Sequence, residues 1–279
     1  AVVVLGFLAF IVWAHHMYMT GMGTVISAFF QTTTLLISIP SVIILTCLFI
    51  SLWGGSIRFN TPMLFALAWL PMFGIGGLTG LPLGFNFSDV ALHDSYYVIA
   101  HFHYVVAPGT IFAIFAGVYY WYPKMTGRIM SEFWGRVHFW SSLIFMNLIF
   151  MPMFAQGMAG MSRRMSDGGA TYSLANPDNA DAGGALSDTI MGLNVSISAA
   201  AWAMLLAQIP FIINLFWSVK YGKKVESDNP WRATTLEWET PTPPPHGNFT
   251  KEIKVYRDPY EYSVPGAKED FTPQAQPSR

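Results

Sequence analysis

Six long apolar stretches follow one another along the chain, separated by short polar segments. Each is about 20 residues or longer, the length that an α-helix needs to cross the hydrocarbon core of a bilayer. The pattern predicts an all-α integral membrane protein with six transmembrane helices. We expect them at 2–20, 25–53, 62–84, 95–122, 133–159 and 187–218. The sixth is the least regular, because polar residues and a proline interrupt it.

The pattern changes after the sixth stretch. Residues 225–279 are polar and proline-rich, and include the run Thr240-Pro-Thr-Pro-Pro-Pro-His246. Such a stretch cannot bury a core of its own. We therefore expect two domains, a membrane half-bundle over 1–224 and an extended tail over 225–279 that packs on the surface or on a partner.

Composition strengthens the membrane prediction. The chain is 53% hydrophobic and only 11% charged, whereas soluble domains carry about 25% charged residues. A net charge of -1 argues against a nucleic-acid partner. One cysteine, Cys47, excludes a disulfide framework and a cysteine-ligated metal. The chain begins at Ala1 without an initiator Met or signal peptide, so we expect a chain that starts inside a helix, as half of something larger would.

Basic residues mark one side of the predicted membrane domain. The segments after the second, fourth and sixth spans carry Arg58, Lys124, Arg128, Arg136, Lys220, Lys223 and Lys224. The positive-inside rule places these segments and the tail on the cytoplasmic or matrix side. The opposite loops carry mainly Asp, together with one basic pair, Arg163-Arg164. Because this pair breaks the rule, we expect it to hold an anion, with a solvated loop pair as the alternative.

Two histidines within the fourth span are candidate cofactor ligands. His101 and His103 are two residues apart, so on a helix they point about 200° apart. One metal could not bind both, but two planar cofactors on opposite sides could. Ionisable residues in membrane spans are costly and usually functional, and neutral imidazole is an axial haem ligand. The alternative for each is a buried, hydrogen-bonded histidine.

Two further pairs lie at span ends. His15 and His16 end the first span, where a fraying helix lets both rings turn to one metal, and imidazole suits copper, iron and zinc. The alternative is a pair of interfacial histidines. His93 and Asp94 offer one N and one O ligand to a cation completed by other groups, although Asp94 is also a favoured helix N-cap. We interpret Tyr18 as an aromatic residue at the membrane interface rather than as a redox-active tyrosine.

Five segments, in order, resemble subunit I of the haem–copper oxygen reductases, most closely cytochrome c oxidase. They are Trp13–Met17, Gly76–Gly80, Asp89–Val105, Gly160–Arg164 and Asn229–Trp238. The resemblance covers the family's C-terminal half, helices seven to twelve of twelve. It implies half of a twelve-helix bundle that is active only together with the missing half of subunit I.

The resemblance implies a role for each candidate pair. His15 and His16 are similar to two of the three ligands of copper B. His101 is similar to the axial ligand of the high-spin haem, and His103 to one of two axial ligands of the low-spin haem.

The resemblance also implies roles for the remaining polar candidates. The resemblance makes His93 and Asp94 magnesium ligands at the boundary with subunit II. It makes Arg163 and Arg164 the residues that bind the haem propionates, which would explain a basic pair on the acidic side, and Asp89 a carboxylate near the propionates.

The implied activity is reduction of O2 to water by a proton-translocating oxidase. The implied cofactors are two haems, expected to be haem a and a3, with copper B and magnesium. The implied partners are the N-terminal half of subunit I, which supplies the third copper ligand, a tyrosine and the second low-spin haem ligand, then subunits II and III, and cytochrome c or another donor. We expect the bacterial plasma membrane rather than the mitochondrial inner membrane.

One position departs from the family. Many members carry a lysine four residues after the proline of their eighth helix, and Ile44 occupies that slot after Pro40. Protons would then pass by water with Ser38, Ser41 and Thr46, or elsewhere. Two alternative functions stay open. A related nitric oxide reductase is disfavoured because the spans hold no Glu before Glu132, and the other is a non-enzymatic haem-binding or transport protein.

Overall fold

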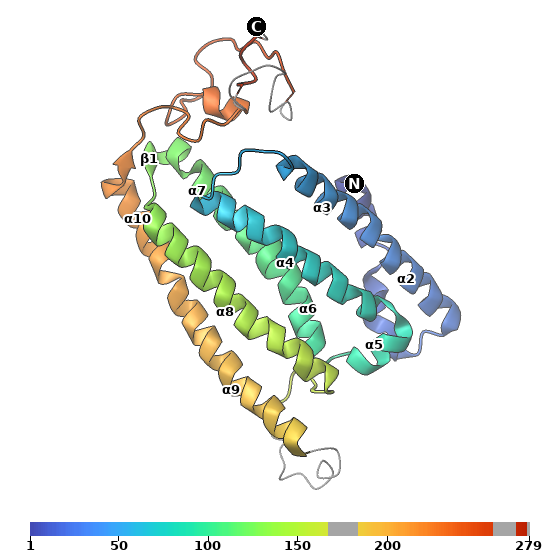
Figure 1. Cartoon of the computed structure of the whole chain (residues 1–279). Coiled ribbons are helices and arrows are strands. Elements are labelled where there is room, and N and C mark those ends of the chain that lie inside the picture. The colour runs from blue at the N-terminus through green and yellow to red at the C-terminus, as the bar shows by residue number, and fades with distance from the viewer. Residues whose placement is uncertain (167–183, 259–271, 278–279) are drawn as a thin grey trace. The chain divides into compact units, whose positions relative to one another are not determined.

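The chain is built almost entirely of helices (Figure 1). The computed structural model describes residues 1–166, 184–258 and 272–277. The elements, where η marks 3-10 and π helices, are α1 Val2–Ala9, η1 Trp13–Thr20, α2 Thr24–Leu36, α3 Ser38–Leu52, α4 Thr61–Gly84, α5 Asn86–Leu92, α6 Tyr96–Val106, η2 Ala107–Phe112, α7 Ala113–Thr126, β1 Arg128–Ile129, α8 Glu132–Met158, α9 Gly184–Ala207, α10 Ile209–Tyr221, β2 Lys223–Lys224 and η5 Leu236–Glu239. The two short strands pair antiparallel.

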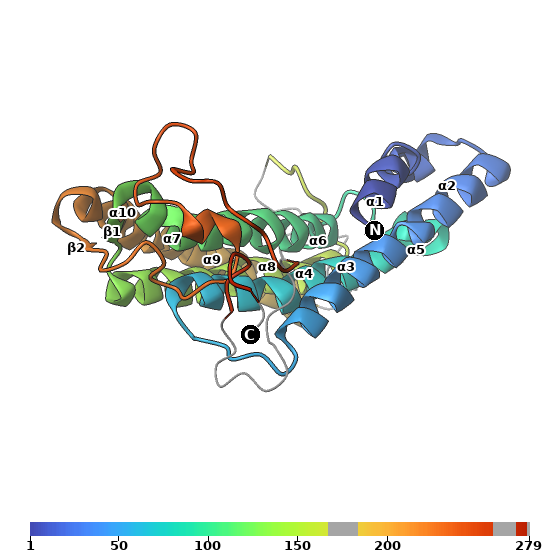
Figure 2. The same cartoon turned by 90° about the horizontal axis from the view of Figure 1, so that it is seen from above.

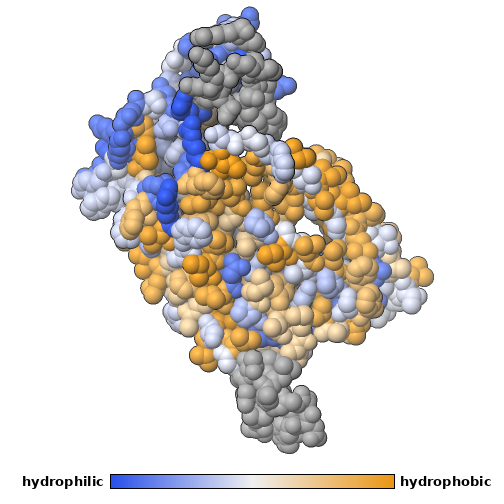
Figure 3. All heavy atoms as spheres, in the orientation of Figure 1, coloured by the Kyte–Doolittle hydropathy of each residue, from blue (hydrophilic) through white to orange (hydrophobic). Residues whose placement is uncertain are grey.

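Six helical stretches are long and apolar enough to cross a membrane. They are Val2–Thr20, Thr24–Leu52, Thr61–Gly84, Tyr96–Thr126, Glu132–Met158 and Gly192–Tyr221. Hydrophobic residues accordingly cover much of the face seen in Figure 3. The predicted all-α membrane fold with six spans is confirmed.

Prolines explain why three spans are not single regular helices. Proline lacks the N–H that would bond the carbonyl four residues earlier. Pro40 follows the break between α2 and α3, Pro108 lies in the π-helical turn η2, and Pro210 follows the break between α9 and α10. Membrane helices tolerate such interruptions because neighbouring groups satisfy the freed backbone.

The helices form two compact units. The first comprises Ala1–Trp53, Ala66–Ala113 and Trp140–Ala207, and the second Gly54–Phe65, Ile114–Phe139 and Gln208–Arg279. The tail thus belongs to the second unit. The division of the chain into domains at residue 224 stays a prediction.

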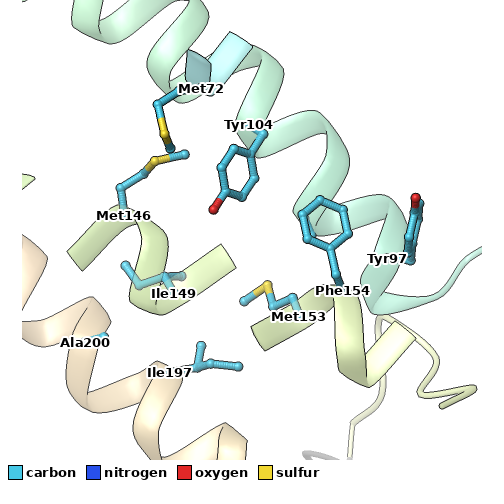
Figure 4. Close-up of a cluster of buried hydrophobic side chains, with 10 residues drawn as sticks. Met72, Tyr97, Tyr104, Met146, Ile149, Met153, Phe154, Ile197 and Ala200 are labelled. Carbon is cyan, nitrogen blue, oxygen red and sulfur yellow. The ribbon is translucent and has the colours of Figure 1, made fainter. Parts of the chain in front are cut away.

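The core of the first unit lies between α4, α6, α8 and α9. Buried Met, Ile and aromatic side chains from these helices pack together (Figure 4). Glycines let the helices beside α6 approach its backbone. A Cβ on Gly76 of α4 would lie 2.9 Å from the carbonyl carbon of Tyr104, and one on Gly157 of α8 would overlap the backbone of Tyr97. The position of α6 is therefore set by close contacts on two sides.

A second group of helices in the same unit contains α1, η1, α2, α3 and α5. These elements contact one another (Figure 2). The 3-10 helix η1, which ends the first span, contacts both α2 and α5. The chain then passes from α5 directly into the polar segment before α6. This packing brings candidate residues that are distant in sequence into one region.

Candidate metal and haem centre

The first candidate pair lies on the 3-10 helix η1. A 3-10 helix turns by about 120° per residue, and here the rings of His15 and His16 fold toward each other. Their Nε2 atoms are 3.0 Å apart, and the Nδ1 of His15 lies 3.0 Å from the hydroxyl oxygen of Thr34 on α2. Two imidazole nitrogens that share one metal ion, each about 2.0–2.1 Å from it, are about this far apart. The separation suits two ligands of one metal, and it is equally that of a hydrogen bond between the two rings.

His101 is anchored on the side of α6 that faces α4. Its Nδ1 is 2.9 Å from the carbonyl oxygen of Gly76 and 3.3 Å from the hydroxyl of Thr79. Its ring occupies space that any side chain at residue 80 would fill, since a Cβ on Gly80 would lie 2.7 Å from the Cε1 of His101. A metal-binding histidine usually donates its second ring nitrogen to such an oxygen. The anchor therefore leaves Nε2 as the nitrogen for a ligand bond.

His103 is hydrogen-bonded within its own helix and packs against α8. Its Nδ1 is 2.8 Å from the carbonyl oxygen of Ile99, and its ring stacks on Phe150 of α8 with centroids 4.2 Å apart. His101 thus contacts α4 and His103 contacts α8, as the helical spacing predicts. The two rings are therefore held on two sides of α6.

The polar segment before α6 places three further candidates together. Asp89 is buried, and its Oδ2 is 3.0 Å from the Nδ1 of His93. Burial raises the pKa of Asp89 above its ordinary value, although His93 opposes this. The Nε2 of His93 then faces the Oδ2 of Asp94 at 3.9 Å. These two atoms could share a cation completed by other ligands.

Asp94 and Arg163, predicted to serve different groups, contact each other directly. The Nε and Nη2 of Arg163 lie 2.6 and 2.5 Å from the Oδ1 of Asp94. Partial burial raises the pKa of Asp94, but the hydrogen bond and positive charge of Arg163 outweigh this and hold it below its ordinary value. Asp94 is not the helix N-cap, because the Ser95 side chain accepts from the N–H of Tyr97.

The loop that carries the arginine pair is tied to the same segment. The N–H of Arg163 donates to the carbonyl of Asp94 at 2.7 Å, and the N–H of Tyr96 donates to Met161 at 2.9 Å. Asp94 and Arg164 both adopt positive φ, 54° and 64°, a region that non-glycine residues seldom occupy. Arg164 is exposed. The acidic residues Asp167, Asp178 and Asp181, further along the same loop, lie outside the described residues.

Three polar groups are buried in a way that the sequence did not predict. His138 in the fifth span is fully buried, between the hydroxyl of Tyr119 at 3.2 Å and the side-chain oxygen of Gln208 at 3.1 Å. A histidine inside an apolar stretch was the available signal. Tyr18 was predicted to lie at an interface, but it is only 5% exposed and donates to the carbonyl of Gly84. Lys124, counted only as a loop charge, is 5% exposed.

Within the described ranges, no group of three or more His, Cys, Asp or Glu residues is arranged to hold a metal ion.

Comparisons with known proteins agree with this architecture. Residues 1–184 match the family model described as cytochrome c and quinol oxidase polypeptide I. The alternative cytochrome c oxidase subunit 1 of Bradyrhizobium diazoefficiens is 45% identical over 279 residues, 99% of this chain and 45% of that protein. The cytochrome c oxidase subunit 1 of Synechocystis sp. is 43% identical over 260 residues, 93% of this chain and 44% of that protein.

A solved structure shares the fold. It is that of a heme-copper terminal oxidase dimer, with a TM-score of 0.62 and 18% identity, covering 78% of this chain and 41% of that one. The protein is thus a multi-pass membrane protein of the haem–copper oxidase fold. The chain belongs to the cytochrome c and quinol oxidase polypeptide I family. It spans less than half the length of these relatives.

Proposed function

We propose that this chain forms part of the catalytic subunit of a terminal respiratory oxidase, which reduces O2 to water. One observation carries the proposal. His101 and His103 each have Nδ1 held by a backbone carbonyl, and the two Nε2 atoms of His15 and His16 converge at 3.0 Å. This arrangement of four imidazoles on η1 and α6 supports a role as ligands.

The residues present fit the groups that the family implies. His15 and His16 would hold copper B, His101 the high-spin haem iron and His103 the low-spin haem iron. Gly80 leaves room for the ring of His101 beside α4, and the ring of His103 stacks on Phe150 of α8, so the two rings that would each hold a planar group lie on two sides of α6. When bound, the haems, proposed to be a and a3, and copper supply the electron transfer to O2.

The polar loops would position the haem edges and a cation. Arg163 and Arg164 would bind propionates, with Asp89 nearby, and His93 with Asp94 would bind magnesium. Arg163 can contact Asp94 and a propionate at the same time. The Oδ1 of Asp94 lies against the Nε and Nη2 of Arg163, which leaves other N–H groups of the guanidinium for the propionate. Oδ2 of Asp94 remains directed toward His93.

Proton uptake would come from the basic side, coupled to proton translocation. Ile44, half-buried on α3, has no group that can carry a proton. The hydroxyl of Ser41 donates to the carbonyl of Ile37 in the same span at 2.9 Å. We therefore propose a route through water beside Ser38, Ser41 and Thr46, or one elsewhere, instead of a lysine route.

The proposed assembly contains the N-terminal half of subunit I, which would supply the third copper ligand, the tyrosine and the second low-spin haem ligand. Subunit II would complete the magnesium site and deliver electrons from cytochrome c or another donor, and subunit III would complete the complex. The bacterial relatives favour the bacterial plasma membrane as its location.

Metal analysis of the purified complex tests the proposal. We expect one copper at this centre for every two haem irons, oxygen uptake, and a haem that binds carbon monoxide. Extra iron without copper would instead indicate a nitric oxide reductase. A complex without oxygen uptake and without a carbon-monoxide-binding haem would indicate a non-enzymatic protein.

A further inference from the structure

The ring of His15 is held by a residue from another helix. The Nδ1 of His15 lies 3.0 Å from Oγ1 of Thr34, which is 19 residues further along the chain, on α2. Among the described residues, the neighbouring His16 makes no corresponding hydrogen bond through its Nδ1; its one side-chain hydrogen bond is through Nε2 to His15. The two rings of the pair are therefore supported differently, and His15 is the one with a fixed orientation.

Thr34 in turn meets a buried tyrosine on the same 3-10 helix as His15. The hydroxyl of Thr34 interacts with the phenol of Tyr18. The phenol donates to the carbonyl oxygen of Gly84, at the end of α4, with an O–O distance of 3.0 Å. A Cβ on Gly84 would lie 3.3 Å from the Cγ2 of Thr34, so Thr34 packs beside the same residue of α4 that accepts the hydrogen bond of Tyr18.

The carbonyl of Gly84 determines which group donates and which accepts among Tyr18, Thr34 and His15. A backbone carbonyl can only accept, so the proton of Tyr18 is directed to Gly84. The phenol oxygen is then free to accept from the hydroxyl of Thr34, and the oxygen of Thr34 is free to accept from a protonated Nδ1 of His15. In that tautomer the Nε2 of His15 carries a lone pair, and it is the nitrogen that faces His16.

We propose that Thr34 and Tyr18 are positioning residues that fix the tautomer and ring orientation of His15, given the copper site proposed for His15 and His16. Both act through His15 and would not touch the metal. The hydrogen bond of Tyr18 also fastens η1 to the end of α4, which holds the whole histidine pair in place.

The test compares variants of the assembled oxidase. Thr34→Val keeps the shape of the side chain but removes the hydroxyl, and Thr34→Ser restores it. Thr32→Val is the matched control, because the only hydrogen bond of the Thr32 hydroxyl within the described part of the chain is to the carbonyl of Ala28 in its own helix. Copper affinity is measured by competition with a chelator, with haem absorbance as the folding control. The infrared C–O stretch of carbon monoxide on copper reports the ligand field independently of turnover.

Loss of an outer hydrogen-bond partner of a metal-binding histidine commonly lowers metal affinity about 10–100-fold. We expect Thr34→Val to lower copper affinity about tenfold and to shift or broaden the C–O stretch. Tyr18→Phe should act in the same direction, while Thr34→Ser and Thr32→Val should match the unaltered enzyme.

Equal copper affinity and an unchanged C–O band in Thr34→Val and Thr32→Val, in complexes with full haem content, would overturn the role of Thr34. A Tyr18→Phe variant identical to the unaltered enzyme would remove Tyr18 from it. An unaltered complex without copper would instead overturn the proposed function, so the two failures are distinguishable.

Discussion

At the scale of single residues, the candidate centre depends on small neighbours as much as on the histidines. Gly80 leaves room for the ring of His101, whose Nδ1 is then held by the carbonyl of Gly76. Gly77, on the same helix, has no atom within 4 Å of its Cβ position. Gly80 is therefore needed to make room for a ring, and Gly77 of the same motif is not. The sequence alone does not distinguish the two glycines.

We predict that Gly80→Ala displaces His101 and lowers occupancy of the carbon-monoxide-binding haem. The added Cβ would lie 2.7 Å from Cε1 of His101, closer than carbon atoms tolerate, so the ring must leave its bond to Gly76. Gly77→Ala should bind haem normally, because its added Cβ would meet no atom within 4 Å. It should also not destabilise the helix, since alanine favours a helix by about 1 kcal/mol over glycine. Haem content and the carbon monoxide difference spectrum check both variants. Equal spectra would contradict the assigned contact.

At the scale of elements, a buried polar group joins helices within the second unit. His138 of α8 is bonded to Tyr119 of α7 and to Gln208 at the break between α9 and α10. Aromatic rings surround it, among them Phe65 and Phe211. In a setting without water, hydrogen bonds between helices specify which faces pack together. His138 therefore fixes the register of three elements.

We predict that His138→Leu lowers the stability of the complex by about 1–3 kcal/mol, because buried polar partners lose a hydrogen bond. The thermal unfolding midpoint measures this. The same exchange at His246, which is exposed in the tail, should leave the midpoint unchanged. The haem spectra of both variants should match the unaltered protein, since the ligand histidines belong to the first unit. A stable His138→Leu complex would show that packing alone sets the register.

At the scale of the whole molecule, all proposed ligands lie in the first unit, and the tail is attached to the second. The ammonium of Lys124 donates to the carbonyl of Thr240 at 2.7 Å and to the hydroxyl of Thr242 at 2.9 Å, and it lies over the ring of Trp238. The indole of Trp231 donates to the carbonyl of Tyr120. The tail is thus fastened to α7 by a buried cation and two indole rings.

We predict that Lys124→Met releases residues 229–242 from α7 and makes them more sensitive to proteases. The variant keeps the length of the side chain but loses both hydrogen bonds and the contact of its charge with the indole ring. Limited proteolysis of the complex, read by mass spectrometry, measures the cleavage rate. Lys220→Met, at a lysine whose ammonium lies over the exposed ring of Tyr221, is the control. Equal cleavage of both variants would mean that the tail is held without Lys124.

The sequence by itself determined the membrane class, the six spans and the candidate ligands. The length of an apolar segment and the 100° turn per residue of a helix are local properties, and both can be taken directly from the sequence. Only the tertiary structure decided which atoms face each other. The contacts of Thr34 with His15, Arg163 with Asp94 and Gln208 with His138 join residues 19, 69 and 70 positions apart. Such contacts depend on how helices pack, and packing depends on side chains from several helices at once, which no local pattern contains.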